Sequence, residues 1–294
     1  MMDRSLYDGR YHRFIEGMEQ IPSLPAVVTR LIKVVSSAET SAEDAAELIE
    51  KDPALTSKVL RLANSAFYGI PRGISSVQSA VVVLGFNTLK SIVLSASVIK
   101  MFPKNKMGSA FDRVRFWKHS IVCALAAKTI AQNTINSLYI DPQSAFCAGI
   151  MHDIGKLIFE LCTPKEYSIV CGKCRINATS LVEEETGAIG LNHADIGRIL
   201  ADKWALPLDI EHTIVHHHFP QAANKIVELV ALVHLADNLA HKLDCGLWEN
   251  ETCQQEWTET RKVLSIDDGR YERIFNSLAG EIEKCNDFFS IISG

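Results

Sequence analysis

The chain of 294 residues lacks the features that mark membrane-spanning and secreted proteins. It contains no uninterrupted apolar run of about 18 residues, the length that a transmembrane helix needs. The longest candidate, Ser79 to Phe102, is broken by a glycine, an asparagine and a lysine. The N-terminal segment Met1 to Arg13 is polar and charged, unlike a secretory signal peptide. We therefore expect a soluble, cytoplasmic protein that does not bind a membrane.

The sequence also lacks a concentration of positive charge. The formal net charge is −5, and no dense run of lysine and arginine is present, so a nucleic-acid partner is not expected. A small basic pocket that binds a phosphate-bearing ligand remains an alternative. The sequence has no repeat and no low-complexity tract, and with 47% hydrophobic residues it has ample material for a core.

Eight cysteines are present, but their settings do not indicate disulfides. Cys123 and Cys147 lie inside apolar, helix-like runs, where cysteine behaves as a small hydrophobic residue. Without a secretory signal, reduced thiols are expected. The pair Cys171 and Cys174 forms a single CxxC motif with no second CxxC and no βαβ context. We interpret it as ordinary helix or loop sequence.

The spacing of apolar residues predicts an all-α fold. Leu55, Val59, Leu62 and Ala66 recur at intervals of three and four, as on one face of a helix. Helix starts are marked by Ser41 with Asp44, by Asp52 before Pro53, and by Pro207. The polar stretch from Pro103 to Gly108 predicts two helical subdomains, residues 1–108 and 109–294.

The segment after Leu243 is less informative. Residues 244–260 are expected to form an exposed insertion that carries Trp248 and Trp257. A closing helix from about Asp267 is expected to bury a stripe of three residues, Ile274, Leu278 and Ile282.

Half of the ten histidines fall in one pattern with two aspartates. The seven residues are His119, His152, Asp153, His193, His217, His218 and Asp237. Imidazole suits Fe, Mn, Zn and similar ions, and a carboxylate can bridge two of them. The set therefore predicts a site for one or two divalent transition-metal ions.

Helical spacing places six of the seven residues on apolar faces. His119 precedes apolar residues at three, four and seven positions, and Asp237 follows valines at four and seven. His152 and Asp153 end a helix that is apolar all round, and a buried carboxylate there needs a cation or several hydrogen-bond donors. Taken alone, a histidine such as His119 could instead be a hydrogen-bonded core residue. Asp237 could instead form a structural salt bridge.

The same spacing distinguishes the buried from the exposed members of the three consecutive histidines 216–218. His217 and His218 follow Ile210 and Ile214 at intervals that place them inward, whereas His216 lies on the polar face. His193 has no such support from spacing.

Several motifs resemble known families. Ile21-Pro-Ser-Leu-Pro25, Lys51-Asp-Pro-Ala-Leu55, Leu62-Ala-Asn-Ser-Ala-Phe-Tyr-Gly69 and Ala80-Val-Val-Val-Leu-Gly85 resemble the HDOD family, the HD-related output domains. His152-Asp153-Ile-Gly155-Lys156 resembles the HD superfamily of metal-dependent phosphohydrolases, and in particular the HD-GYP cyclic-dinucleotide phosphodiesterases. Together these motifs extend from Ile21 to about Leu243.

The resemblance implies how the ligands divide between two ions. His119, His152, Asp153 and Asp237 would form the first site. His193, His217 and His218 would complete the second, with Asp153 as the bridge. The metals would be Fe or Mn by preference, with Zn as an alternative. In an enzyme, Lys156 would be catalytic, holding a phosphate oxygen or stabilising the leaving group.

The chain departs from the HD-GYP pattern after the histidine pair. It continues Phe219-Pro220-Gln221, where that family has a glutamate and then a Gly-Tyr-Pro loop. Three hypotheses follow: a regulatory output module of bacterial signal transduction, a phosphohydrolase of a cyclic dinucleotide or other phosphoester, or an empty vestige of a metal site. We favour the regulatory module, with a signalling protein or a nucleotide or phosphate-bearing ligand as partner, because the substrate-positioning loop is missing.

Overall fold

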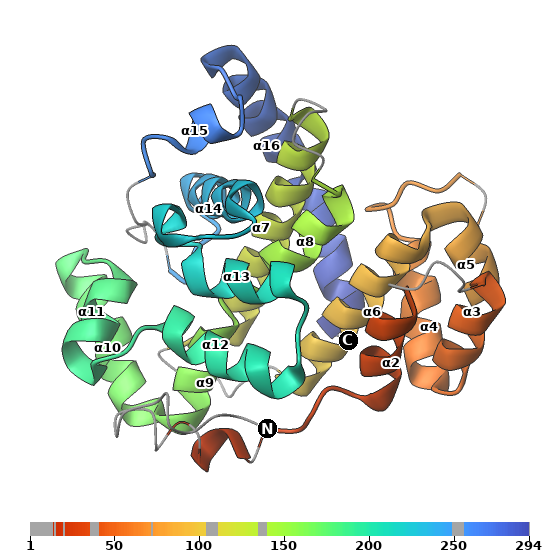
Figure 1. Ribbon diagram of the computed structural model, residues 1–294, viewed down its shortest axis with the longest axis horizontal. Helices are drawn as coiled ribbons and strands as arrows, with labels where there is room; N and C mark the ends of the chain where they lie inside the picture. The colour runs from red at the N-terminus through yellow and green to blue at the C-terminus, as the bar shows by residue number, and fades with distance from the viewer. Residues whose placement is uncertain are drawn as a thin grey trace. The chain divides into compact units, whose positions relative to one another are not determined.

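The computed structural model describes residues 14, 16–19, 21–35, 41–71, 73–103, 111–134, 140–248 and 256–293 (Figure 1). Within these ranges every regular element is a helix and no strand is present. This confirms the predicted all-α fold. Among the same residues, no helix combines the length and apolarity needed to cross a membrane.

The chain divides into two compact units. One contains the described parts of Met1–Ser23 and Lys104–Ala279, and the other contains Leu24–Pro103 and Gly280–Gly294. The change at Pro103 coincides with the polar stretch seen in the sequence. The end of the chain, however, is grouped with the smaller unit, so the division into residues 1–108 and 109–294 stays a prediction.

The smaller unit is built mainly from five helices. They are α2 (Ala26–Val35), α3 (Ala42–Glu50), α4 (Pro53–Ala63), α5 (Val77–Leu84) and α6 (Phe86–Met101), joined by the end of α16 (Asp268–Ser293). The predicted caps are present: Ser41 and Asp44 form a reciprocal capping box, and Asp52 accepts hydrogen bonds from the first turn of α4. Asn64 also has a structural role, because its side chain bonds both the N–H and the carbonyl of Ile74.

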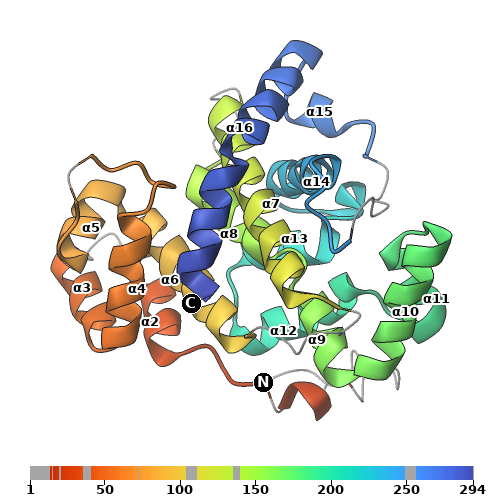
Figure 2. The same ribbon diagram turned by 180° about the vertical axis from the view of Figure 1, so that it is seen from behind.

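The larger unit contains the predicted metal ligands. Its helices are α7 (Arg113–Asn133), α8 (Pro142–Met151), α9 (Ile154–Cys162), α10 (Pro164–Asn177), α11 (Leu181–Ile189), α12 (His193–Trp204), α13 (Leu208–His216), η3 (Pro220–Ala222), α14 (Val227–Lys242), α15 (Thr260–Val263) and the first part of α16, up to Ala279. Helix α7 packs against α8 and α14, and α12 packs against α9 and α13 (Figure 2).

Two glycines allow these helices to approach closely. A Cβ atom on Gly149 of α8 would lie 2.6 Å from Cα of Ala124 on α7. A Cβ atom on Gly155 of α9 would overlap the backbone carbonyl oxygen of His193 at the start of α12. Larger residues at these positions would push the helices apart. Gly155 therefore sets the distance between Asp153 and His193.

The segment after Leu243 differs in part from the prediction. Trp248 is buried, with the guanidinium of Arg175 5.3 Å from its ring centroid, so this part of the segment is not an exposed insertion. Residues 249–255 lie outside the described residues. In α16, Ile274 and Leu278 are buried as expected, whereas Ile282 is only half-buried. Cys171 and Cys174 are buried in α10.

Candidate metal centre

Five separate parts of the larger unit supply the seven predicted ligands. His119 lies on α7, His152 and Asp153 at the junction of α8 and α9, His193 at the first position of α12, His217 and His218 at the end of α13, and Asp237 on α14. The structure brings all seven together. All are buried except His218, which is half-buried.

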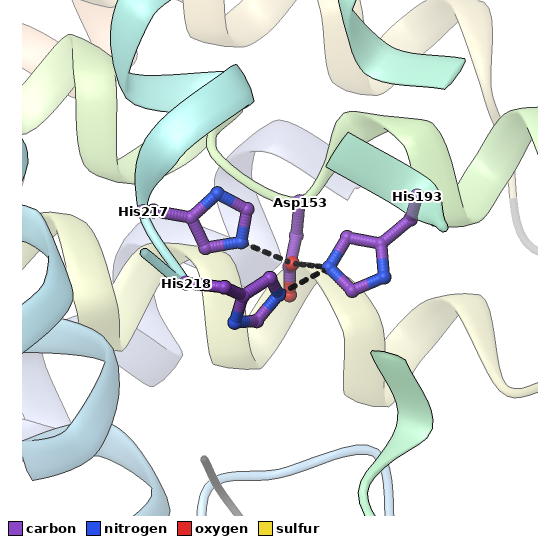
Figure 3. A group of neighbouring side chains, drawn as sticks. All are labelled: Asp153, His193, His217 and His218. Carbon is purple, nitrogen blue, oxygen red and sulfur yellow. Dashed lines mark hydrogen bonds and ion pairs between the residues drawn. The ribbon is translucent and has the colours of Figure 1, made fainter. Parts of the chain in front are cut away.

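Asp153 lies at the centre of the cluster, and its two oxygens face different histidines. Oδ1 is 3.1 Å from Nε2 of His193 and 3.4 Å from Nε2 of His217 (Figure 3). Oδ2 is 3.5 Å from Nε2 of His119 and 3.3 Å from Nε2 of His152. The carboxylate therefore stands between two groups of imidazoles, which is the position of a bridging ligand.

His218 completes the group on the Oδ1 side. Its Nε2 lies 2.6 Å from Nε2 of His193 (Figure 3). The ligand atoms of Asp153, His193, His217 and His218 all lie within 4.8 Å of one another.

Asp237 completes the other group and adds a residue that the sequence analysis missed. Its Oδ1 is 3.1 Å from Nε2 of His119, 3.6 Å from Nε2 of His152 and 3.4 Å from Nε2 of His241. His241 lies one helical turn after Asp237 on α14, so the i, i+4 spacing of the two residues was the available signal. His119, Asp237 and His241 could hold a metal ion as a third group.

The second nitrogen of each inner histidine is fixed by an acceptor. Nδ1 of His119 lies 3.0 Å from the carbonyl oxygen of Cys245, and Nδ1 of His152 lies 2.7 Å from that of Gly149. Nδ1 of His217 lies 3.0 Å from the carbonyl oxygen of Ile214. Nδ1 of His193 lies 2.6 Å from Oε2 of Glu185. A carbonyl or carboxylate oxygen cannot donate, so Nδ1 carries the proton in all four rings. In the neutral ring, Nε2 then presents a lone pair toward the aspartates.

This arrangement fits a metal ion. Nε2 of His119, His152 and His217 and Oδ1 of Asp153 and Asp237 are buried without a hydrogen-bond partner. Lone pairs that face carboxylate oxygens at such short range repel one another unless a proton or a metal ion lies between them. Metal bonds to histidine and carboxylate are about 2.0–2.2 Å long, which places the ligand atoms of one ion roughly 3 Å apart. The buried cluster could therefore hold a metal.

The charges of the metal-free cluster are strongly perturbed. Burial lowers the pKa of His119, and it lowers the pKa of His217 to about 4. Burial would also lower the pKa of His152, but the charge of Asp153, together with Cys123 and hydrogen bonds to Asp153 and Asp237, outweighs it and raises that pKa well above its usual value. Burial would raise the pKa of Asp153, but His152 and Lys156 hold it well below its usual range.

Lys156 contacts a candidate ligand directly. Its buried Nζ donates a hydrogen bond of 2.6 Å to Oδ2 of Asp153. The ammonium supplies part of the positive charge that the buried carboxylate needs. In the described structure it lies on a carboxylate of the cluster, so a role in holding a phosphate stays a prediction.

The remaining histidines of this region lie outside the cluster. His216 lies beside His212, with ring centroids 5.6 Å apart and ring planes at 52°, and is half-buried rather than fully exposed. His234 bonds the carbonyl of His217 through Nδ1 and accepts the backbone N–H of Trp257 at Nε2. It thus fixes the backbone of a candidate ligand.

Glu185 is the second residue that the sequence analysis missed. It is fully buried on α11 and accepts hydrogen bonds from the backbone N–H and Nδ1 of His193 and from the hydroxyl of Tyr167. Its place in a run of three glutamates gives no sign of burial. A carboxylate that receives Nδ1–H fixes the ring and makes Nε2 more basic.

Replacing Glu185 with glutamine is expected to weaken metal binding at the His193 side by about 10- to 100-fold, because the neutral amide polarises the imidazole less. The measurement is competitive metal titration. Tyr167→Phe removes only the hydroxyl at the far oxygen of Glu185 and serves as the control. Equal affinities of Glu185→Gln and the parent protein would contradict this role.

The metal-free protein is expected to lose stability as the pH falls from 6.5 toward 4. His217 has its usual pKa of 6.5 when unfolded and about 4 when folded, so between these values only the unfolded chain binds the proton. The difference corresponds to about 3 kcal/mol, present in full above pH 6.5. His152 acts oppositely: its raised pKa gives stability that is lost as the pH rises above 6.5.

Urea unfolding of the chelator-treated protein at pH 7 and pH 5 measures this dependence. His217→Gln is expected to reduce the difference between the two pH values. An unchanged difference would show that His217 does not carry the acid sensitivity.

Comparisons with known proteins agree with the motifs. The family model of the HDOD domain matches residues 21–220. An uncharacterized protein of Treponema pallidum is 24% identical over 233 residues, which are 78% of this chain. The chain spans less than half of that relative, since the match covers 44% of it.

Solved structures share the fold. An HDOD domain protein with unknown function from Geobacter sulfurreducens is 26% identical, with a TM-score of 0.79 over 96% of this chain and 98% of that one. A Shewanella amazonensis protein, provisionally named a phosphohydrolase, is 24% identical with a TM-score of 0.75 over 97% and 100%. A Marinobacter aquaeolei protein, provisionally named a signal transduction protein, is 19% identical with a TM-score of 0.79 over 97% and 66%.

Proposed function

The chain belongs to the HDOD domain family, and from that premise we propose that it is a regulatory output module of bacterial signal transduction with a two-ion metal centre. Its partner would be a signalling protein or a phosphate-bearing ligand in the cytoplasm. The observation that carries the proposal is the position of Asp153, whose two oxygens face two groups of buried imidazoles.

The two groups define the proposed sites. His119, His152 and Asp237 would hold the first ion together with one oxygen of Asp153, and His241 is available beside Asp237. The second ion would be held by His193, His217, His218 and the other oxygen of Asp153. Imidazole and carboxylate ligands favour Fe or Mn, and Zn also fits.

Burial supports a regulatory role over a catalytic one. His152 and His217 have no exposed surface, and Asp153 is 1% exposed. A phosphoester substrate must contact the ions directly, so it needs an open path to them. Ions held by these buried ligands would join the helices that carry them, and occupancy would change the stability of the larger unit.

A metal-dependent phosphohydrolase is the second candidate. The bridging position of Asp153 and the buried ammonium of Lys156 favour it, and the name given to the Shewanella amazonensis protein points the same way. Bound ions would supply charge that stabilises the transition state of phosphoester hydrolysis. Lys156 would have to leave Asp153 in order to reach a substrate.

An assay with cyclic dinucleotides and a generic phosphodiester separates the two functions. The protein would be loaded with Mn²⁺ or Fe²⁺ and compared with His152→Ala, and His216→Ala would be the control outside the cluster. We expect no hydrolysis above background, together with greater resistance to proteolysis when metal is bound. Hydrolysis that disappears in His152→Ala and persists in His216→Ala would overturn the regulatory proposal.

A further inference from the structure

Helices α9 and α12 both begin at the proposed metal centre. Asp153 is the N-cap residue of α9, and His193 is the first residue of α12. The two helices pack against each other, most tightly where Gly155 meets the backbone carbonyl of His193. At a rise of about 1.5 Å per residue, α9 is about 13.5 Å long and α12 about 18 Å long. Their other ends, at Cys162 and Trp204, are therefore remote from the metal ligands.

The N-terminal segment contacts the far end of α9. This segment comprises the described residues 14, 16–19, 21 and 22, and it belongs to the larger unit (Figure 1). The ring of Phe14 meets that of Phe159 edge-on, with centroids 5.2 Å apart, and neither side chain is exposed. A Cβ atom on Gly17 would lie 2.6 Å from Sγ of Cys162, the last residue of α9. The segment is thus packed closely against the last turns of α9.

The same segment is bound by the last two residues of α12. Nζ of the half-buried Lys203 donates hydrogen bonds to the backbone carbonyl oxygens of Met18 and Ile21, the second at 2.8 Å. The indole N–H of Trp204 donates to the carbonyl oxygen of Pro22 at 3.1 Å. Hydrogen bonds from an ammonium group are about twice as strong as those between neutral groups. Helix α12 therefore holds the backbone of a segment that lies 182 to 185 residues away in the sequence.

A single segment thus joins the two helix ends that are farthest from the metal ligands. Because a helix moves as a rigid element, a shift at the far end of α9 or α12 displaces the ligand at its start. We propose that the N-terminal segment is a positioning element of the metal centre, whose docking on α9 and α12 keeps Asp153 and His193 at the distance that metal binding requires. This inference rests on the proposed two-ion centre.

The proposed coupling acts in both directions. If the docked segment strengthens metal binding, bound metal must stabilise the docked segment by the same factor. The chain passes from this segment into the smaller unit, which begins at Leu24. Metal occupancy would therefore control how firmly the residues that lead into that unit are held. Such control is an output that the proposed regulatory module requires.

Hydrogen–deuterium exchange of the full chain, with and without Mn²⁺, tests the coupling without any substitution. We expect two equivalents of Mn²⁺ to slow amide exchange in a peptide that covers residues 14–24 by about fivefold or more. Helix α14, which carries Asp237, is expected to slow as well and reports metal binding itself. Slower exchange in α14 with unchanged exchange in residues 14–24 would overturn this proposal and leave the metal centre intact. Unchanged exchange in both, with no metal taken up, would refute the two-ion centre and this proposal with it.

Two substitutions at the end of α12 test the coupling from the other side. Lys203→Met keeps most of the side chain but removes the donor to Met18 and Ile21, and Trp204→Phe removes the donor to Pro22. Each is expected to weaken Mn²⁺ binding by about fivefold or more in a competitive titration. Each is also expected to reduce the effect of Mn²⁺ on exchange in the N-terminal segment.

Lys173→Met is the matched control, since Lys173 is an exposed lysine of α10, and it is expected to bind Mn²⁺ as the parent does. Thermal unfolding shows whether each variant is folded. If both α12 variants are folded and bind Mn²⁺ as tightly as the parent protein, the segment does not position the metal centre and the proposal is wrong. Should a variant fail to fold, the exchange measurement on the parent protein still decides between the two outcomes.

Discussion

The Asp153→Asn variant is expected to retain less than about a tenth of the metal that the parent protein binds. Asparagine keeps the size of the side chain but removes the negative charge that both groups of imidazoles share. It also leaves the buried ammonium of Lys156 without the carboxylate at 2.6 Å. Loss of one partner of a buried ion pair costs about 3–5 kcal/mol, so stability falls as well.

Two further variants separate metal loss from destabilisation. Asp195→Asn alters a carboxylate of the α12 capping box, two residues after His193 but outside the cluster, and is expected to keep its metal. Asp153→Asn combined with Lys156→Met removes both members of the ion pair and is expected to recover stability but not metal. Elemental analysis and urea unfolding measure the two effects. Full metal content in Asp153→Asn would contradict the bridging role.

The Gly155→Ala variant is expected to lose about 1–3 kcal/mol of stability or more, together with metal affinity. The added methyl group would overlap the carbonyl oxygen of His193, so α9 and α12 must separate and carry Asp153 away from His193. Urea unfolding and metal titration report these two losses.

Gly172→Ala is the matched control for that substitution. Gly172 lies within α10, and a Cβ atom there meets nothing within 4 Å. Alanine is a better helix former than glycine by about 1 kcal/mol, so this variant is expected to be slightly more stable than the parent. If Gly155→Ala were as stable as Gly172→Ala, the close approach of α9 and α12 would not be required.

The sequence predicted the fold class and six of the seven predicted ligands from the arrangement of apolar residues along single helices, whereas His193 followed only from the resemblance to known families. The i, i+3 and i, i+4 pattern identifies buried faces, and it separated His216 from His217 and His218. Helix caps can be predicted in the same way, because their hydrogen bonds join residues two or three positions apart. The sequence therefore identified the caps at Ser41 and Asp52.

Features that depend on how helices meet were not predictable in this way. Glu185 is buried because α11 faces the start of α12, and nothing in a run of glutamates indicates that contact. The division of the imidazoles between the two oxygens of Asp153 depends on the relative positions of five segments. Trp248 is buried by tertiary contacts, including Arg175, that are far away in the sequence.

The most direct test of the proposed two-ion centre is the metal content of the protein purified without added metal or chelator, measured by inductively coupled plasma mass spectrometry. We predict about two equivalents of Fe, Mn or Zn per chain, with both lost in Asp153→Asn, as expected for ions that share a bridging carboxylate. Less than about a tenth of an equivalent of any transition metal, with no uptake when Fe²⁺, Mn²⁺ or Zn²⁺ is supplied, would contradict the metal centre.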